Sequence, residues 1–517
     1  ARFELPTVVR VAGGWVRDKL LGGESHDIDV ALDDMTGVAF ANLVNDHLAE
    51  QGEPTHRIGL IQANPEQSKH LETAALTVLG KTIDFVNLRS EEYHDASRIP
   101  SIRFGTAKED AERRDFTINS LFFNVNDSCL EDLTGLGLAD LRAGIIRTPL
   151  PPAQTFRDDP LRMLRAIRFA SRFDFELDTT VQEALKDRDN HEALSSKISR
   201  ERIGTELASM LRGPRPVQAL ELLEKYDLLA VVLQYPGISP PSNLPRIDPR
   251  EMDIVDEAGC REALCGADWT GRVAVVARLD AFLREDLFEA RTALGDGVDP
   301  ELHALAGVLH GFEAQHGLNA RFRPEALIPV LVRDALKLKA TLANAVKEVV
   351  EAVPKIRAVL GDLEGPGARL QVGRLMCHYR AHFQLAMCLL VSIDAELRAP
   401  LEALHKRITS DWELAGVWND PPVFNGKELI KALEFKRGGP HIGEFMSRQQ
   451  DWMVLNRGGS NDDRKAECLA HLTAQKEEVL ALVEERAREA ELARIAEAQR
   501  KKEEKKRRRE EEQRLTQ

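Results

Sequence analysis

The sequence changes character near residue 150, and this change constrains the fold more than any other feature. Before it, helix-like segments such as WVRDKLLGG (15–23) alternate with the strand-like runs VVRVAGG, HDIDVAL, TAALTVL and TIDFVNL. Gly80 and Lys81, between the last two runs, predict a two-residue hairpin turn. After residue 150 only helical periodicity remains. The pattern predicts an α+β protein, with an α/β unit at its N-terminus and an all-helical remainder.

Composition limits the partners and the compartment. No stretch approaches the ~20 apolar residues that span a bilayer, and six cysteines without a C-x-x-C pair fit a reducing compartment. Lys+Arg is 70 and Asp+Glu is 84, a formal charge of −14 that argues against a nucleic-acid partner unless local basic patches overcome it. Cys377, His378 and His382 are interpreted as residues of one buried helix rather than as a zinc site, because a fourth ligand at the usual spacing is missing.

Carboxylates on two of the predicted strands indicate a metal site. Asp27 and Asp29 lie at i and i+2 of a strand, so their side chains point to one face, roughly 7 Å apart. Two bare carboxylates repel, so a cation is expected, and oxygen ligands without nearby Cys or His favour Mg²⁺. A solvated strand face is the alternative. Asp84 lies among apolar neighbours in a later strand and is a third candidate, with a buried hydrogen bond as the alternative.

The turn Gly13-Gly14 precedes these carboxylates, between a predicted strand and a predicted helix. Backbone N–H groups at such a turn can hold a triphosphate, and Arg17 in the following helix is a further candidate for nucleotide binding. Paired glycines, a D-x-D strand and one later strand carboxylate resemble the nucleotidyltransferase superfamily that includes DNA polymerase beta. The resemblance implies two Mg²⁺ ions, which activate the 3′-hydroxyl and hold the triphosphate for in-line displacement.

Further segments resemble one family within that superfamily. In chain order they are RFGTAKEDAERRDFTINSLFFNV, EDLTGLGLADLRAGIIRTP, FRDDPLRMLRAIRFASRF and ISRERIGTEL. They are similar to the class II tRNA nucleotidyltransferases, the CCA-adding enzymes, and to the related bacterial poly(A) polymerases. The resemblance runs from Arg10 to about Leu211 and resumes weakly at FNGKELIKAL and GGPHIGEF. The segment KHLETAALTVLGKTIDFVNLRSEEYHDASRIP is similar to the eukaryotic branch, the fungal enzymes in particular.

The resemblance implies template-independent addition of C, C and A to the 3′ end of tRNA from CTP and ATP. It also implies a catalytic head of the polymerase beta type (1–150), a helical neck that selects the base (151–215), a helical body (216–415), a helical tail that contacts tRNA (416–476) and a charged C-terminal extension (477–517). The family's ribose-recognition motif matches a group of polar residues for which a surface salt bridge is the alternative, namely Arg113, Arg114, Asp115 and Asn119.

Asp159 and Arg162 match the end of the family's base-selecting motif, although Asp158 and Pro160 depart from its common Glu and Ala. Three residues apart, Asp159 and Arg162 are expected on one helix face. A carboxylate only accepts hydrogen bonds and a guanidinium only donates them. Cytosine and adenine each present an amine donor beside a ring-nitrogen acceptor, whereas uracil and guanine reverse both positions. One such pair therefore admits CTP and ATP and can reject UTP and GTP by roughly 10⁴ or more.

Two groups of basic residues are candidate contacts to phosphate. Arg165 and Arg168 continue the register of Arg162, and we expect this stripe to face the triphosphate and the RNA end, with a merely solvated face as the alternative. Ahead of a Gly-Gly-Pro turn that predicts a helix start lies a second cluster, Lys427, Lys431, Lys436 and Arg437. This cluster is a candidate contact to the acceptor and T-arm region of tRNA, which is recognised by shape rather than by sequence.

The last segment, from Arg500 to Arg514, has nine basic and five acidic residues. It is interpreted as a solvated, partly frayed helix, with an accessory RNA contact or a nuclear-import signal as the alternative.

The whole sequence predicts a CTP/ATP:tRNA nucleotidyltransferase that works as a monomer with two Mg²⁺ ions, binds no membrane, and acts inside the cell in the cytoplasm, the nucleus and the mitochondrion. The nearest alternatives share its chemistry: CC addition only, A addition only, or poly(A) synthesis. The loop SEEYHDASRIPSIRFGTAKED is of full length, which favours complete CCA addition. A non-catalytic RNA-binding protein on a transferase scaffold is an alternative of another class, against which the intact D-x-D and D-x-x-R motifs argue.

Overall fold

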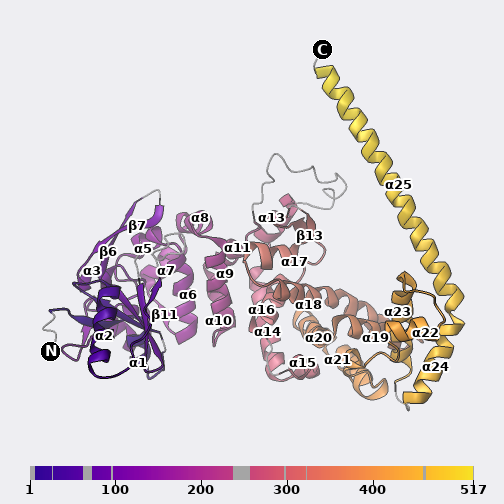
Figure 1. Cartoon of the computed structure of the whole chain (residues 1–517), viewed down its shortest axis with the longest axis horizontal. Coiled ribbons are helices and arrows are strands. Elements are labelled where there is room, and N and C mark those ends of the chain that lie inside the picture. The colour runs from indigo at the N-terminus through magenta and orange to yellow at the C-terminus, as the bar shows by residue number, and fades with distance from the viewer. Residues whose placement is uncertain are drawn as a thin grey trace. The chain divides into compact units, whose positions relative to one another are not determined.

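The computed structural model describes residues 6–25, 27–61, 73–94, 97–236, 257–295, 299–321, 323–457 and 461–515. By contact the chain forms two compact units, each discontinuous in sequence. The first unit consists of residues 1–281 and 298–350, and the second of residues 282–297 and 351–517. Figure 1 traces the elements of both units, with most strands near the N-terminus and helices through the rest of the chain.

A seven-stranded sheet occupies the N-terminal part of the first unit among the described residues, in the order β3-β4-β5-β2-β1-β8-β9. β2 and β5 run parallel, and the other neighbours run antiparallel. The parallel pairing sets Asp29 directly beside Asp84. The strands of this sheet are β1 (Val9–Ala12), β2 (Ile28–Leu32), β3 (Gly59–Ile61), β4 (Thr73–Val78), β5 (Lys81–Asn87), β8 (Leu121–Asn124) and β9 (Cys129–Asp132).

The hairpin between β4 and β5 turns at Leu79 and Gly80, so the predicted turn at Gly80 and Lys81 is wrong by one residue. Both turn residues have positive φ, 51° and 73°, as a favoured two-residue hairpin turn requires. Lys81 pairs with Val78 in the ladder and therefore belongs to the strand.

Helices α1 (Gly14–Leu20), α2 (Gly37–Glu50) and α3 (Ala107–Glu112) accompany the sheet. α2 starts very close to β5: a Cβ on Gly37 would lie 2.3 Å from the carbonyl oxygen of Phe85, so glycine is required there. Between α2 and the sheet lies an apolar core that includes Leu32, Leu76 and Phe85. β6 (Arg89–His94) and β7 (Ser97–Phe104) form a separate antiparallel ribbon ahead of α3.

The expected loss of strand structure after residue 150 is confirmed in outline, but the remainder is mostly rather than wholly helical. β10 (Ile145–Ile146) pairs with β11 (Glu176–Leu177), and β12 (His316–Leu318) pairs with β13 (Pro324–Ala326). Strands of two or three residues carry no periodic signal, so the sequence pattern could not predict them. Most of the proline-rich run 235–249 lies outside the described residues.

The other elements of the first unit are helical. α5, α10 and α16 each have proline in the first helical turn, where the missing N–H costs no hydrogen bond. The elements are the 3₁₀ helix η2 (Thr117–Asn119), α4 (Gly137–Ala143), α5 (Pro152–Asp158), α6 (Leu161–Phe173), α7 (Thr179–Leu185), α8 (Arg188–Lys197), α9 (Arg200–Leu211), α10 (Pro216–Lys225), α11 (Leu228–Val232), α13 (Glu257–Cys265), α14 (Trp269–Arg284), α16 (Pro300–Leu309), α17 (Leu327–Pro329), the π-helix η4 (Val330–Ala335) and α18 (Ala340–Val359). The ends of α14 and α18, from residues 282 and 351 on, belong to the second unit.

The second unit is helical in its described residues. Its elements are η3 (Leu287–Glu289), α15 (Ala290–Leu294), η5 (Leu360–Asp362), α19 (Ala368–Tyr379), α20 (His382–Ile393), η6 (Ala395–Leu397), α21 (Arg398–Lys406), η7 (Arg407–Asp411), η8 (Val417–Asn419), α22 (Gly426–Ala432), α23 (Pro440–Leu455), α24 (Asn461–Ala474) and α25 (Lys476–Leu515).

His378 and His382 lie on different helices of this unit. The chain leaves α19 at Arg380, with φ 52° and ψ −131°, and α20 begins at His382. The prediction of one continuous buried helix is therefore wrong. Among the described residues, the group of three potential metal ligands does not include these histidines. The described helices also contain no segment with the length and apolar character needed to cross a membrane.

Candidate active site

Three carboxylates meet at the paired strands β2 and β5. Asp29 on β2 and Asp84 on β5 are register partners, and Asp27 lies directly before β2. Each residue offers a carboxylate oxygen within 4.8 Å of those of the other two. Asp27 is exposed, whereas Asp29 and Asp84 are half-buried. The expectation that Asp84 joins Asp27 and Asp29 in space is confirmed.

The electrostatics of this cluster suit a divalent cation. Burial, followed by the charge of Asp27, raises the pKa of Asp29 to about 6, and the positive charge of Arg114 only partly opposes this. Burial and a neighbouring carboxylate thus both disfavour the charged form of Asp29, and a bound cation would offset both effects. Carboxylate oxygens are the ligands that hard divalent cations prefer, so the residues fit a metal of the Mg²⁺ class.

The paired glycines form a tight turn beside the cluster. Gly13 has a φ of 69°, and its N–H donates to the carbonyl oxygen of Leu121 at 3.0 Å. A Cβ on Gly13 would lie 2.6 Å from a guanidinium nitrogen of Arg114. At Gly14, a Cβ would lie 3.5 Å from Arg17. Glycine at position 13 therefore serves both the turn and the close approach of Arg114.

Arg17 is buried, with 4% of its side chain exposed. It donates to the side-chain oxygen of Asn119 and, at 2.6 and 2.8 Å, to Asp18. Its guanidinium carbon lies 5.1 Å from the ring centroid of Phe169 and 4.7 Å from that of Phe173. Burial lowers the pKa of Arg17. In this arrangement Arg17 ties α1 to η2 and α6.

Arg113 and Arg114 converge on Asp110, a buried carboxylate that was not predicted from the sequence. Arg113 donates to Asp110 at 2.5 and 3.0 Å, and Arg114 donates to it at 3.0 Å. Burial opposes the charge of Asp110, but the two arginines outweigh it and lower its pKa to about 2. The sequence spacing could have predicted these contacts, because Asp110 precedes the two arginines by three and four residues across the end of α3.

Asp115 is the second buried carboxylate of this region. It accepts from the backbone N–H of Phe116 at 2.9 Å, from Asn119 at 3.0 Å and from Arg165 at 2.6 and 2.8 Å. Burial raises the pKa of Asp115, but the charge of Arg165 and the bond from Asn119 prevail and lower it to about 2. Asp115 therefore joins the ribose-recognition candidates to α6.

Asp159 and Arg162 do not share a helix face, and that prediction is wrong. Asp159 lies between α5 and α6 in an extended conformation, φ −138° and ψ 97°, and α6 begins at Leu161. The residue before a proline is disfavoured in the helical region, so Pro160 accounts for the break. Asp159 accepts from Arg202 at 2.9 Å, and Arg162 donates to the carbonyl oxygen of Arg113 at 2.7 Å.

The arginines of α6 meet acids instead of forming a bare stripe. Arg165 is one-third exposed and is held by Asp115, while Arg168 donates to Glu206 at 2.6 Å. Arg165 also lies 3.7 Å from Glu206. Glu206 and Arg202 both lie on α9, and neither was predicted from the sequence. Their partners are 38 and 43 residues away in the chain, and no local pattern reports such a contact.

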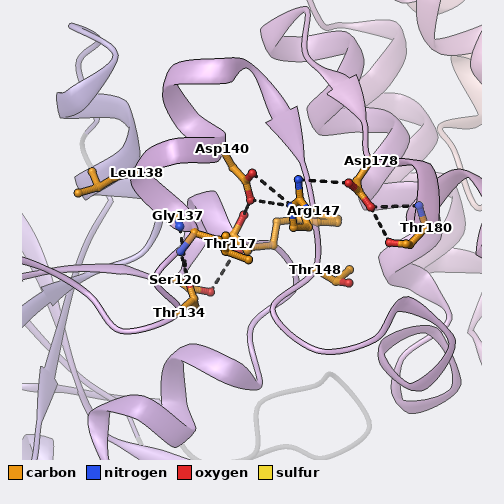
Figure 2. A network of polar contacts seen from close by, with 12 residues as sticks. Thr117, Ser120, Thr134, Gly137, Leu138, Asp140, Arg147, Thr148, Asp178 and Thr180 are labelled. Atoms are coloured by element: carbon orange, nitrogen blue, oxygen red, sulfur yellow. Dashed lines mark hydrogen bonds and ion pairs between the residues drawn. The ribbon is translucent and has the colours of Figure 1, made fainter.

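A polar network joins η2 to the helices that follow (Figure 2). Thr117 donates to Asp140 at 2.7 Å, and Arg147 contacts Asp140 and Asp178, each at 3.2 Å. Asp178 in turn accepts from the backbone N–H of Thr180 at 3.0 Å, at the start of α7. The segment that carries Asn119 is thus fixed to the region after residue 150.

The basic cluster of the second unit lies around the starts of two helices. Asn425 caps α22 through a capping box, and Pro440 begins α23 after Gly438 and Gly439, which confirms the predicted helix start. A groove of about 560 Å³ lies between these ends and is lined by Lys427, Ile430 and Ile442 among others. Lys427, Lys431, Lys436 and Arg437 are exposed, and within the described part of the chain no ion pair engages them.

The chain is similar to known proteins over most of its length. Residues 9–147 match the family model described as "Poly A polymerase head domain", and residues 174–240 match "Probable RNA and SrmB- binding site of polymerase A". The mitochondrial CCA tRNA nucleotidyltransferase of Saccharomyces cerevisiae is 34% identical, over 91% of this chain and 88% of its own length. The tRNA nucleotidyltransferase cca2 of Schizosaccharomyces pombe is 32% identical, over 90% of this chain and 92% of its own length.

Solved structures share the fold. A CCA-adding enzyme in complex with ATP aligns with a TM-score of 0.60 and 22% identity, over 92% of this chain and 91% of its own. The Thermotoga maritima CCA-adding enzyme complexed with tRNA_CCA aligns with a TM-score of 0.58 and 21% identity, over 91% of this chain and 92% of its own. These likenesses extend the shared architecture beyond the N-terminal sheet to nearly the whole chain.

Proposed function

This chain belongs to the CCA tRNA nucleotidyltransferase family, and from that membership we propose how its residues divide the work of the reaction. The protein adds C, C and A to the 3′ end of tRNA from CTP and ATP, without a nucleic-acid template. The observation that carries this function is similarity over nine-tenths of the chain, joined to three carboxylates that can meet within 4.8 Å.

The carboxylate cluster is the proposed metal site. Asp27, Asp29 and Asp84 would hold divalent cations, and we propose two Mg²⁺ ions. Bound there, the ions would polarise the reacting phosphate and favour ionisation of the RNA 3′-hydroxyl. Gly13 and Gly14 lie beside the cluster; the N–H of Gly13 donates to Leu121, so the N–H of Gly14 is the one proposed to donate to a phosphate oxygen.

Two further groups of residues are proposed to bind the ribose and the base of the incoming nucleotide. Arg113, Arg114, Asp115 and Asn119 are the proposed ribose contacts, with Asp110 holding both arginines in position. Asp159 and Arg162 are the proposed base selectors. Arg202 binds one carboxylate oxygen of Asp159, and a carboxylate has lone pairs to accept further bonds. Arg162 donates through one nitrogen to the Arg113 carbonyl oxygen and keeps other N–H groups for a base.

The remaining basic residues are proposed to contact phosphate. Arg165 is one-third exposed and can donate a further hydrogen bond, whereas Arg168 is held more fully by Glu206. Arg17, buried among polar and aromatic partners, would support the nucleotide site from behind. The exposed cluster Lys427, Lys431, Lys436 and Arg437 would bind backbone phosphates of the acceptor and T-arm region.

We further propose a monomer, because all of the candidate catalytic side chains come from one chain. The relatives from Saccharomyces cerevisiae and Candida glabrata are mitochondrial by name, which supports the mitochondrion as one site of action beside the cytoplasm and the nucleus. We propose that the chain is organised, at the boundaries given above, into a catalytic head, a neck, a body, a tail and a C-terminal extension.

The decisive experiment offers tRNA transcripts that lack the terminal CCA, or that end in C or CC, to the protein with each labelled NTP and Mg²⁺. We expect C, C and A in that order, and a loss of at least about 10³-fold in Asp29→Asn, because metal ions contribute several kcal/mol to such transfers. Asp34→Asn, which removes an exposed carboxylate outside the cluster, is the matched control. Addition of C alone or A alone would establish a narrower product, and undiminished addition by Asp29→Asn would refute the metal assignment.

A further inference from the structure

Phe104 is unusual among the aromatic residues of this chain. Of the Phe, Tyr and Trp side chains that the structure describes, only that of Phe104 is exposed, at 65%. The other described rings are buried or half-buried. Single exposed apolar side chains are common on protein surfaces, so the case for Phe104 depends on its position and on its aromatic ring.

The backbone around Phe104 is firmly held. Phe104 ends β7, and the N–H of Gly105 donates to the carbonyl oxygen of Leu88 at 3.2 Å. A Cβ on Gly105 would lie 2.6 Å from the backbone of Arg89, so the two segments are in close contact. On the other side, Arg103 forms an ion pair with Glu109 of α3 at 3.1 Å. The ring therefore projects into solvent from a fixed position.

Arg89 relates this position to the candidate active site. Phe104 lies directly opposite Arg89 in the antiparallel ribbon, so the two side chains share one face of that ribbon. The backbone N–H of Arg89 donates to Asp110 at 3.3 Å, and its carbonyl oxygen accepts from Arg113 at 3.2 Å. Arg89 also begins β6 only two residues after the end of β5, the strand that carries Asp84. The exposed ring thus lies opposite a residue whose backbone contacts Asp110 and Arg113, on the ribbon that follows the Asp84 strand.

We propose that Phe104 stacks against the 3′-terminal base of the RNA that is being extended. This inference rests on the proposed function. Each addition brings two bases to the carboxylates, the base of the incoming nucleotide and the last base of the RNA. Asp159 and Arg162 account for the first, and none of the residues assigned above accounts for the second.

An aromatic face suits this second base. The RNA end is single-stranded, and its last base changes as C, C and A are added. Hydrogen-bonding groups would favour one base, whereas every base has a face that can stack on a ring. Phe104 would accordingly hold the end without selecting its sequence.

Steady-state kinetics can test the proposal with tRNA ending in CC and with ATP. Base–aromatic stacking gives about 5- to 150-fold in binding, so Phe104→Ala should raise the KM for RNA by that range. The KM for ATP should change by less than twofold. Phe104→Trp should stay near wild type, and Phe104→Leu should resemble Phe104→Ala, because leucine is apolar but has no face to stack on. Leu79→Ala, which trims another exposed apolar side chain in the β4–β5 turn, is the control and should change neither KM.

A binding measurement without turnover separates stacking from catalysis. RNA that carries 2-aminopurine at its 3′ end should lose fluorescence on binding wild type and much less on binding Phe104→Ala. Equal quenching by both proteins, or a Phe104→Leu variant with wild-type kinetics, would overturn the proposal. A wild-type protein that adds no nucleotide would refute the proposed function instead, whereas an active wild type with an unchanged Phe104→Ala refutes only the stacking.

Discussion

Buried carboxylates hold the arginines of the site in place. Asp110 receives both Arg113 and Arg114, and Asp115 receives Arg165 from another helix. Removing one partner of a buried pair leaves the other charge without compensation, which costs far more than losing a surface pair. These acids therefore set the geometry that the substrate meets, although neither is a metal ligand in the proposed mechanism.

Asp115 should make stability depend on acid pH. Its folded pKa of about 2 is below the ordinary value of 3.8, so its contribution of about 2 kcal/mol is complete above pH 3.8 and disappears as the pH falls through 2. Between pH 5 and pH 3, about 1 kcal/mol of it should be lost. Urea denaturation at both pH values should show a smaller difference for Asp115→Asn than for wild type.

Asp174→Asn is the control for that measurement. Asp174 is 57% exposed and lies in the left-handed region, which asparagine also tolerates. Its pH dependence should match that of wild type. An Asp115→Asn protein with the full wild-type difference between pH 5 and pH 3 would contradict the assigned role of the buried pair.

Arg162 should decide which nucleotides are accepted. Removing its guanidinium takes away the donors that match cytosine N3 and adenine N1, so Arg162→Ala should lower the preference for CTP over UTP by about 10²-fold or more. The measurement is competition between labelled CTP and UTP on tRNA lacking CCA. Arg202→Ala, which frees Asp159 but leaves Arg162 intact, should lose rate while it keeps most of the preference. Unchanged rejection of UTP by Arg162→Ala would refute the selector assignment.

The proposed metal ligands were predictable from the sequence, and the residues of α9 that bind Asp159 and the arginines of α6 were not. Asp27 and Asp29 follow from period-2 alternation within one strand, and Asp84 follows from an acid among apolar neighbours. Glu206 and Arg202 reach their partners across 38 and 43 residues. Sequence spacing reports neighbours on one element, so contacts between elements stay hidden until the fold is known.

At the scale of elements, α9 serves two purposes through two faces. Arg202 and Glu206, four residues apart, bind Asp159 and the arginines of α6. Arg200 and Gly204, also four residues apart, meet the end of η4: Arg200 donates to the carbonyl oxygen of Ala335 at 2.9 Å. One helix therefore connects η4 to Asp159, one of the proposed base selectors.

Gly204 is the closest contact on that second face. A Cβ there would lie 1.7 Å from the carbonyl oxygen of Leu336, and a backbone atom cannot move aside cheaply. Gly204→Ala should destabilise the protein by about 1–3 kcal/mol and also lower activity, because α9 would shift away from Asp159. Chemical denaturation and the CCA assay check both effects. Gly361→Ala, where a Cβ meets open space, should lower neither one.

Helix boundaries explain why one expectation at this scale was wrong. The three-residue spacing of Asp159 and Arg162 suggested one helix, but Pro160 keeps Asp159 extended and makes it precede α6. The effect of proline on its preceding residue was available from the sequence. Asp159 nevertheless stays attached to the start of α6, where Arg162 lies, since the N–H of Leu161 donates to its carboxylate at 3.2 Å.

Across the whole molecule, α25 is anchored only at its start within the described residues. Val479 is buried in the core of the last four helices, and Glu478 and Arg486 form ion pairs with α23. From Glu484 onward the described side chains are exposed. The long charged helix therefore contributes to stability through its first turns.

Truncations can test this division. A protein that ends after Glu489 should keep its melting temperature, because it retains Val479 and both ion pairs. A protein that ends after Gln475 should lose about 1.5–3 kcal/mol of stability with the buried Val479 side chain alone. Calorimetry on both proteins makes the comparison. Equal melting temperatures for the two would show that α25 does not support the core.

The broad division of the chain was predictable, but its two compact units were not. The composition shift near residue 150 marks the end of the main sheet, because strand and helix periods differ. Residues 282–297 belong to the second unit, whereas residues 298–350, which follow them in the chain, belong to the first. Helical periodicity is the same in both, so no local pattern marks the crossings.

That crossing has a consequence during protein synthesis. Residues 282–297 belong to the same unit as α20, in which the thiol of Cys388 donates to the carbonyl oxygen of Leu287 at 3.1 Å. Residues 298–350, which belong to the other unit, are synthesised between these two segments. At 5–20 residues per second, Phe288 and its neighbours wait roughly 3 to 10 s on the ribosome before their unit begins to emerge. Slower translation of residues 298–350 would prolong this exposure, so synonymous codons in that stretch can alter the soluble yield of an unchanged protein.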